Sequence, residues 1–369
     1  MNMRYAEAIA RSIQRRIEAC SLDLSGLVVA TECANDAYAT TAAAALAAGA
    51  KEVWAYGRDS SWATLQQSAA DVQALALALG AKVERLHVVQ SRQAIPWPNV
   101  DLVTNSGHLR PLDAEILSAI PSSAVIALMF EAWELRNGDI DLDIARSRGI
   151  SIFGVDEHHP ACGSFEFVGA LAVSEVMRQR WSLGDAKVAV ISDNAFMGPV
   201  LRAMTAMGAQ AIAVDPNPNR RSNSELQSHL RLSSDKILSG QGPAFDLAVV
   251  ATTPAAVAEQ SGQVAIAPKA LAELVAACGV YGCIQLWGDI DRGSAEAKGV
   301  KFGPNDTPKP GHQAIAMNAA GYEATVRLQV GGLAAALHGL RQRQGVPTPE
   351  HLIGLTQSLS LTESSTQES

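Results

Sequence analysis

Acidic and imidazole side chains of this chain gather at the ends of apolar runs, where open α/β sheets bind their ligands. Asp156, Glu157, His158 and His159 directly follow the strand-like run ISIFGV. Carboxylates and imidazoles exchange protons near neutral pH, so this cluster could hold a substrate or move a proton. Neighbouring histidines point in different directions, which argues against a shared metal ion. We expect Asp156 to bind substrate, His158 to act in catalysis, and no metal.

A second acid, Glu131, follows the buried run AVIALMF. As a catalytic residue it would serve as a base or bind the hydroxyl groups of a ligand. An exposed carboxylate near the start of a helix explains the same residue through the helix dipole alone. The sequence leaves both interpretations open.

Glu32 ends the first strand-like run, LVVATE, and Asn105 and Ser106 end a later one, DLVTNS. If these strands are parallel, their carboxyl ends meet at one edge of a sheet. We therefore predict that Glu32, Asn105 and Ser106 bind a small polar substrate at that edge, together with Asp156.

An internal repetition predicts the elements that would position these residues. GLVVATECANDAYATTAAAALAAGAKEVWAYGRD and AKVAVISDNAFMGPVLRAMTAMGAQAIAVDPN share their order of apolar and small residues. Each is typical of a strand, a polar turn, a helix, a Gly-Ala step and a second strand, a unit that winds right-handed into a parallel sheet. The sequence thus predicts an α/β fold of two Rossmann-like, doubly wound domains with a cleft between them.

The boundary between the two domains is expected at Trp181–Asp185, after a long helical segment. The first domain is then 1–181 and the second 182–311. A helical segment within 312–350 is expected to return to the first domain. Residues 355–369 are polar and aperiodic, which predicts a disordered tail.

Composition narrows the classes of partner. The net charge is −8 and no run of Lys or Arg could follow a phosphate backbone, so nucleic acid is not expected. The Ala-rich stretch 42–50 is too short to span a bilayer, and no signal-like opening segment is present, so a cytoplasmic protein is predicted. The five cysteines are irregularly spaced and predict reduced thiols.

The segment VDLVTNSGHLRPLDAEILSAIPSSAVIALMFEAWELRNGDIDLDIARSRGISIFGVDEHHP resembles the substrate domain of D-2-hydroxyacid dehydrogenases. The next segment, FEFVGALAVSEVMRQRWSLGDAKVAVISD, is similar to the linking helix and first cofactor strand of that superfamily, whose outline adenosylhomocysteine hydrolases share. The resemblance covers 100–340. It implies a Rossmann domain inserted into a flavodoxin-like domain, NAD or NADP as cofactor, and a homodimer.

The glycine-rich turn of that family is represented here by the residues Asp193 to Gly198. Only Gly198 matches the pattern, while Asp193 adds negative charge where a pyrophosphate would lie. Under the resemblance, Asp193, Asn194 and Gly198 contact the cofactor, and Asp215 bonds the ribose hydroxyls.

His312 resembles the dehydrogenase histidine before the final helix, although 251–288 contains no arginine to match the family's substrate clamp. The leading hypothesis is an enzyme on a small polar metabolite, with His312, Glu131 and His158 as catalytic residues. A non-redox enzyme or transferase that binds adenosylmethionine, and a binding protein without turnover, remain as alternatives.

Overall fold

The computed structural model describes residues 1–216, 231–261 and 263–359. Its described part divides into two compact units. The first unit comprises Met1–Ser164 and Tyr322–Ser369, and the second comprises Phe165–Gly321.

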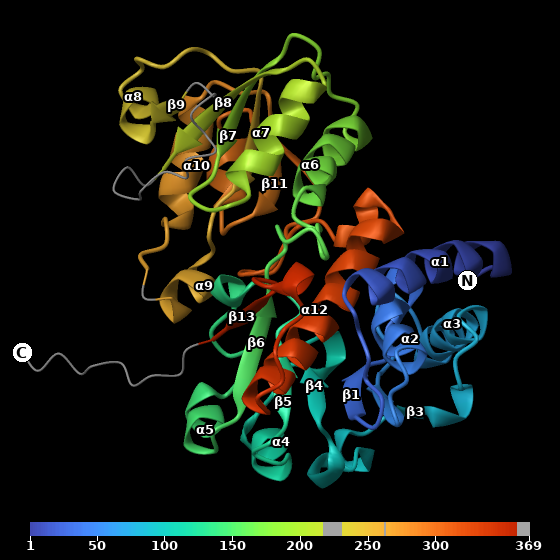
Figure 1. Ribbon diagram of the computed structural model, residues 1–369. Coiled ribbons are helices and arrows are strands. Elements are labelled where there is room, and N and C mark those ends of the chain that lie inside the picture. The colour runs from blue at the N-terminus through green and yellow to red at the C-terminus, as the bar shows by residue number, and fades with distance from the viewer. Residues whose placement is uncertain (217–230, 262, 360–369) are drawn as a thin grey trace, which may run out of the picture. The chain divides into compact units, whose positions relative to one another are not determined.

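The first unit contains a seven-stranded sheet in the order β13-β6-β5-β4-β1-β2-β3 (Figure 1). Its strands are β1 (Val28–Glu32), β2 (Glu52–Tyr56), β3 (Leu86–Val89), β4 (Leu102–Thr104), β5 (Val125–Ala127), β6 (Ser151–Val155) and β13 (Thr356–Ser358). Its helices are α1 (Met3–Ala19), α2 (Thr40–Ala47), α3 (Leu65–Ala78), α4 (Ala114–Ala119), α5 (Leu142–Ser147) and α12 (Tyr322–Arg343). All neighbouring strands are parallel except β13, which pairs antiparallel with β6.

The second unit repeats this winding in a six-stranded sheet, β12-β11-β10-β7-β8-β9. Its strands are β7 (Lys187–Ile191), β8 (Gln210–Asp215), β9 (Arg231–Ser233), β10 (Leu247–Ala251), β11 (Gly282–Trp287) and β12 (Lys301–Gly303). Its helices are α6 (Phe167–Arg178), α7 (Met197–Ala206), α8 (Ser234–Leu238), α9 (Ala255–Gln260), α10 (Pro268–Ala277) and α11 (Arg292–Glu296). The predicted α/β fold with two doubly wound sheets is confirmed.

Both sheets reverse their strand order at one place. In the first unit this switch point lies between β1 and β4, and in the second between β7 and β10. Helices that leave the two strands there run over opposite faces, which opens a crevice at the carboxyl ends. Each unit thus has one position where a doubly wound fold binds its ligand.

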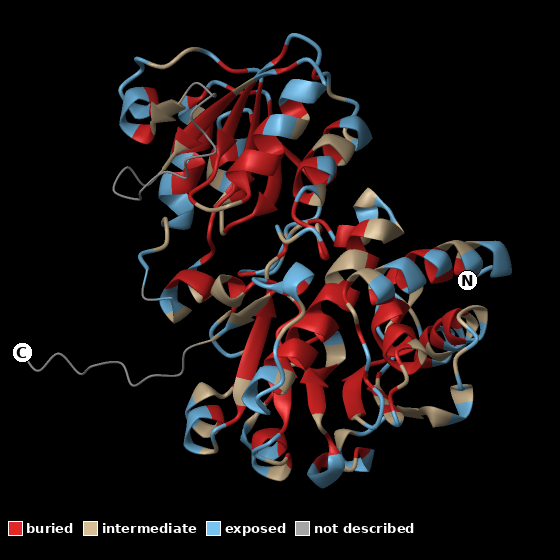
Figure 2. Ribbon diagram, viewed as in Figure 1, coloured by how far each residue is buried: buried red, intermediate tan, exposed pale blue. Residues whose placement is uncertain are grey.

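The core of the first unit lies on both faces of its sheet (Figure 2). Helix α12 lies on one face, where it packs with α1 and α2. Three glycines let α12 approach the sheet: a Cβ on Gly332 would lie 3.0 Å from the Cα of Met129, and one on Gly339 would lie 2.6 Å from the Phe153 ring. The third, Gly331, would meet Cys162 in the same way. These glycines allow α12 to pack closely on the first unit's core, and the helix continues through them from Tyr322 to Arg343.

Two boundaries differ from the prediction. Helix α6 belongs to the second unit because it packs along α7, whereas the sequence assigned it to the first domain. Residues Thr356–Ser358 form an edge strand, so the predicted tail is wrong at its start; 360–369 lie outside the described residues. Backbone hydrogen bonds to β6 hold this polar segment as a strand. The apolar periodicity of a sequence cannot reveal such a strand, because its side chains are polar. The last long helix, α12, is part of the first unit.

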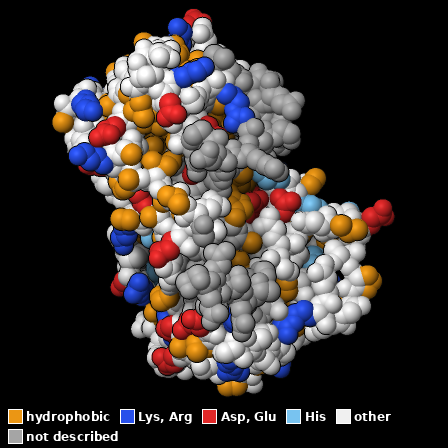
Figure 3. Space-filling model, turned by 90° about the vertical axis from the view of Figure 1, so that its left-hand side faces the viewer, with side chains coloured by type: hydrophobic (Ala, Val, Ile, Leu, Met, Phe, Trp, Pro, Cys, Tyr) orange, Lys and Arg blue, Asp and Glu red, His pale blue; other side chains and the backbone are white. Residues whose placement is uncertain are grey.

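No described helix has both the length and the apolar character needed to cross a membrane. On the face shown in Figure 3, Lys and Arg side chains are interspersed with Asp and Glu. That face therefore carries no stripe of one sign.

Candidate functional site

Three hydroxyl groups form a chain at the switch point of the first unit. The Thr104 hydroxyl donates to Thr31 Oγ1 at 2.8 Å across the β1–β4 pair, and it lies 2.7 Å from Ser106 Oγ. All three side chains are buried. The chain ties the carboxyl ends of the two central strands together on the face that α12 and α2 cover.

Asn105 follows β4 and has no exposed surface. Neither Nδ2 nor Oδ1 of its side chain has a hydrogen-bond partner among the described residues. A buried polar group without a partner costs about 1–3 kcal/mol of folding stability. Such an amide at the switch point is the expected state of a ligand-binding residue without its ligand.

Glu32 ends β1, the strand that pairs with β4, and is also buried. One carboxylate oxygen accepts the backbone N–H of His108 at 3.1 Å. Gly107, at φ +29°, leaves the space that this carboxylate fills, since a Cβ there would overlap it. Burial raises the pKa of Glu32, and the nearby Arg110 opposes that rise. Arg110 makes its own ion pair with Asp139 at 3.6 Å.

A buried acid cluster lies at the ends of β5 and β6. Its members are Glu131, Glu134 and Glu157. Glu131 accepts hydrogen bonds from Trp133 Nε1 and from the backbone N–H of Glu157, the latter at 3.1 Å. Glu157 accepts the Ser164 hydroxyl at 2.8 Å, whereas Oε1 of Glu134 has no partner among the described residues.

The three carboxyl groups are held in different protonation environments. Burial raises the pKa of Glu157 to about 8, so this group keeps its proton at neutral pH. Burial and the charges of Glu157 and Glu131 raise the pKa of Glu134 well above its ordinary value. Burial also raises the pKa of Glu131, and the hydrogen bonds from Trp133 and from the backbone of Glu157 offset part of that rise. Buried carboxyl groups with raised pKa values are typical of sites that transfer protons.

The interpretation of Glu131 as an exposed acid at a helix start is wrong. Its residue is 4% exposed, and its carboxylate makes no cap bond to the short 3₁₀ helix Ala132–Glu134 that follows. His158 is exposed, and its backbone N–H donates to Asp156 Oδ1 at 2.9 Å. Asp156 is half-buried, and through this hydrogen bond its side chain stabilises the turn in which both residues lie.

In the second unit, side chains bridge the switch point between β7 and β10. Asp193 Oδ1 accepts both the backbone N–H and the hydroxyl of Thr253, at 2.8 and 2.9 Å. Asn194 Nδ2 donates to the carbonyl of Ala251 at 3.0 Å and to Thr253 Oγ1 at 3.2 Å. The two loops that would admit a pyrophosphate are therefore bonded to each other.

At the start of α7, two of the amides that could face a phosphate are already bonded within the turn. The side-chain oxygen of Asn194 accepts the N–H of Phe196 at 3.0 Å, and its carbonyl accepts the N–H of Met197. Pro199 has no N–H, and Gly198 is buried within the helix. These residues do not fit a dinucleotide bound in the ordinary way, since its pyrophosphate needs such amides.

Asp215 ends β8, as the sequence predicted for the acid that would bond ribose. Its carboxylate lies 3.5 Å from Arg231 Nη2 of the neighbouring strand. Phe196 packs between Phe165 and Trp287, with both ring centroids 5.2 Å away. The aromatic side chain thus belongs to the core of the second unit.

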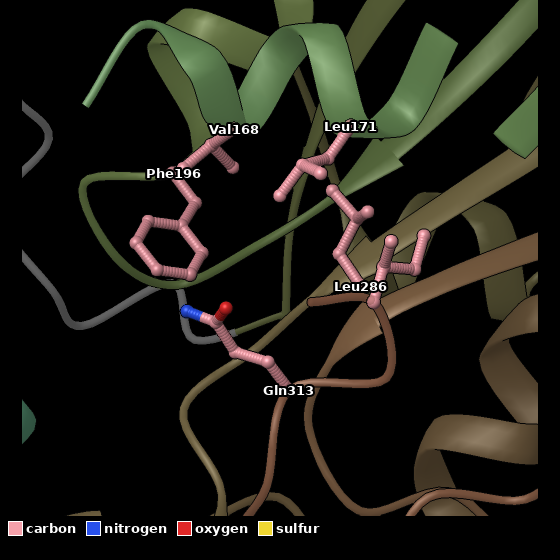
Figure 4. Close-up of a pocket in the computed structure, with 6 residues that line it drawn as sticks. Val168, Leu171, Phe196, Leu286 and Gln313 are labelled. Carbon is pink, nitrogen blue, oxygen red and sulfur yellow. The ribbon is translucent and has the colours of Figure 1, made fainter. Parts of the chain in front are cut away.

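A small apolar pocket lies beside this aromatic group (Figure 4). Its free volume is about 10 Å³, the space of about one water molecule. It is lined by Val168, Leu171, Phe196, Leu286, Gln313 and Ile315. Neither its size nor its lining suits a nucleotide.

His312 lies in an exposed turn of the second unit, and its Nδ1 is 3.0 Å from the carbonyl oxygen of Pro310. Helix α12 begins at Tyr322, after a separate 3₁₀ turn, Met317–Ala320, so His312 lies before the last helix and outside it. The structure places Glu131 and His158 in the first unit and His312 in the second. A joint role of the three stays a prediction.

Sequence reasoning left three residues of this site out of its predictions. Arg110, Asp139 and Ser164 lie outside the strand ends and follow no local pattern, and they reach the site through tertiary packing. Glu157 stood within the predicted cluster at Asp156–His159, but the burial of Glu157 and of Glu134 depends on tertiary packing and could not be foreseen from the sequence. In the described part of the chain, no group of three or more acidic, histidine or cysteine side chains could hold a metal ion.

Comparisons with known proteins bear on the fold. No protein-family model and no curated protein sequence matches the chain. A dipicolinate synthase structure from Bacillus halodurans matches with 14% identity and a TM-score of 0.54, over 84% of this chain and 98% of that chain. A dipicolinate synthase structure from Bacillus subtilis matches with 13% identity and a TM-score of 0.52, over 88% and 99%.

A D-lactate dehydrogenase from Treponema pallidum matches with 11% identity and a TM-score of 0.48, over 90% of this chain and all of that chain. At these identities the likeness extends to the fold alone. The chain has a two-domain Rossmann-like fold similar to that of the two dipicolinate synthase structures.

Proposed function

We propose that this protein is an enzyme of dehydrogenase-like fold that acts on a small polar metabolite at the carboxyl edge of the first unit's sheet. The observation that carries the proposal is a set of buried acids with raised pKa values and an unpartnered buried amide, all at the carboxyl ends of strands of one sheet. Groups of this kind at a switch point are typical of a substrate site.

In the proposed reaction Glu131 is the proton acceptor. Its two hydrogen-bond donors stabilise the carboxylate that forms when the group is ionised. Glu157 holds a proton at neutral pH, and Ser164 fixes the orientation of that carboxyl group. Asn105, Ser106 and Glu32 hold the substrate at the neighbouring strand ends.

The second unit argues against hydride transfer from a dinucleotide, and this favours a reaction based on proton transfer in the first unit. The bridge across the second unit's switch point and the bonded amides of Phe196 and Met197 argue against a pyrophosphate bound there. Asp215 keeps one feature of a ribose site, which favours NAD or adenosylmethionine as second candidates. We propose that the reaction needs neither ligand.

The test uses a mixture of small metabolites in D₂O with the purified protein, followed by NMR. An enzyme that removes a proton from carbon exchanges it for deuterium, so one C–H signal should fade. Glu131→Gln should slow this exchange by about a hundredfold or more. Glu84→Gln, which changes an exposed acid of the same unit, should leave it unchanged.

Calorimetric titration with NADH, NADPH and adenosylmethionine completes the test, because a bound ligand also raises the melting temperature. Oxidation of NADH by a 2-oxo acid would replace the proposal with the dehydrogenase candidate. Failure of every metabolite to exchange or turn over, with the protein folded, would indicate a binding protein.

A further inference from the structure

The two polar atoms of the Asn105 side chain determine which ligand groups can form hydrogen bonds with both of them. Its Nδ2 donates and its Oδ1 accepts, and both atoms are buried without a partner among the described residues. A group that pairs with both must present an acceptor beside a donor, as a primary carboxamide does. A carboxylate or phosphate oxygen would satisfy Nδ2 and leave Oδ1 facing another acceptor.

The neighbour of Asn105 on the sheet is an acid. In the β1–β4 register Ala30 pairs with Val103, and Glu32 and Asn105 each follow two residues later, at the carboxyl ends of these two strands. Side chains alternate along a strand, so these two share the face opposite to the hydrogen-bonded Thr31 and Thr104. A ligand on Asn105 therefore lies close to the Glu32 carboxyl group, which favours a donor or a positive charge.

Other buried acids lie along this sheet edge. Among the described residues, no Lys or Arg forms an ion pair with any of its buried glutamates: Glu32, Glu131, Glu134 and Glu157. Two guanidinium groups that interact electrostatically with these acids, Arg110 with Glu32 and Arg136 with Glu134, form their ion pairs with Asp139, at 3.6 and 2.9 Å. The charge that would recognise an anion is used within the protein.

We propose that the Asn105 site takes an uncharged or cationic ligand with a primary carboxamide, or an equal donor–acceptor pair, and rejects carboxylates and phosphates. This inference rests on the proposed substrate site in the first unit. Under this proposal the ligand differs in charge from the substrates of 2-hydroxyacid dehydrogenases, because 2-hydroxy acids are anions.

The experiment compares matched probes that differ in one group: lactamide with lactate, nicotinamide with nicotinate, and glycinamide with glycine. Binding is measured by ligand-observed NMR and by thermal shift. At least one amide should bind the wild type, and its carboxylate partner should bind about tenfold more weakly or worse.

Asn105→Leu is the test variant because it nearly keeps the side-chain shape and removes both polar atoms. It should retain or raise the melting temperature and weaken amide binding by about tenfold or more. Asn99→Ala is the matched control, since Asn99 is exposed and precedes the same strand. It should bind like the wild type.

Two results would overturn the inference in distinguishable ways. If a carboxylate binds as well as its amide and the binding depends on Asn105, the ligand class is wrong while the proposed substrate site stands. If no probe binds, or if probes bind Asn105→Leu as tightly as the wild type, then Asn105 is not a ligand-binding residue. The substrate role that the proposed function gives to Asn105 is then wrong as well.

Discussion

At the scale of single residues, the buried acids should make stability depend on pH. Glu157 has a pKa of about 8 in the folded protein, against an ordinary value of 4.5. Below the lower value both states carry the proton, and the folded state is at no disadvantage. Between the two values the unfolded chain ionises first, so stability falls as the pH rises towards 8.

Glu157→Gln should remove much of this loss. The amide stays neutral and still accepts the Ser164 hydroxyl. The expected gain relative to wild type grows from pH 5 to pH 8, by at most about 1.4 kcal/mol for each unit of pKa change. Urea denaturation at several pH values measures it, with Glu84→Gln as control. Parallel curves for wild type and Glu157→Gln would show that Glu157 ionises normally.

At the scale of elements, close helix packing builds the second unit. A Cβ on Gly169 of α6 would lie 2.4 Å from the carbonyl oxygen of Pro199 and 2.7 Å from the Cβ of Ala203, both on α7. Backbone atoms cannot yield as a flexible side chain can. The absence of a side chain at Gly169 therefore sets how α6 and α7 pack, and α7 carries the turn that replaces the phosphate cradle.

Gly169→Ala should destabilise the protein by about 1–3 kcal/mol, the usual cost of overpacking. Gly184→Ala is its control, because no atom lies within 4 Å of a Cβ there and the backbone is not left-handed. That variant should change stability by less than about 1 kcal/mol, if anything upwards. Chemical denaturation distinguishes them; equal effects would mean that α6 and α7 separate easily.

At the scale of the whole molecule, the two units differ in how the chain builds them. The second is one continuous segment with its own sheet and apolar core. The first is made of two segments, and α12 from the later one buries Val326, Val330 and Leu333 against the earlier one.

The fragment 165–321 should therefore fold alone, whereas 1–164 should not. Without α12, one face of the first sheet loses its cover and exposes apolar surface to water. Circular dichroism during heating should show one cooperative transition for 165–321 and none for 1–164. A cooperative transition of 1–164 would indicate that α12 is dispensable for its core.

By itself, the sequence determined the two doubly wound sheets, the edge at which polar residues end the strands, and the departure from a glycine-rich turn. Local patterns suffice for these, because strand–turn–helix order and apolar runs depend on neighbours along the chain. Glu131, Asn105 and Asp193 were found in this way.

Only the tertiary structure decided what these residues do. Burial of Glu131, Glu134 and Glu157 in one place and the unpaired amide of Asn105 depend on contacts between segments far apart in sequence. The same holds for the bridge from Asp193 to Thr253, sixty residues away. Hydrogen bonds and desolvation set the chemistry of a side chain, and both arise only when the chain is folded.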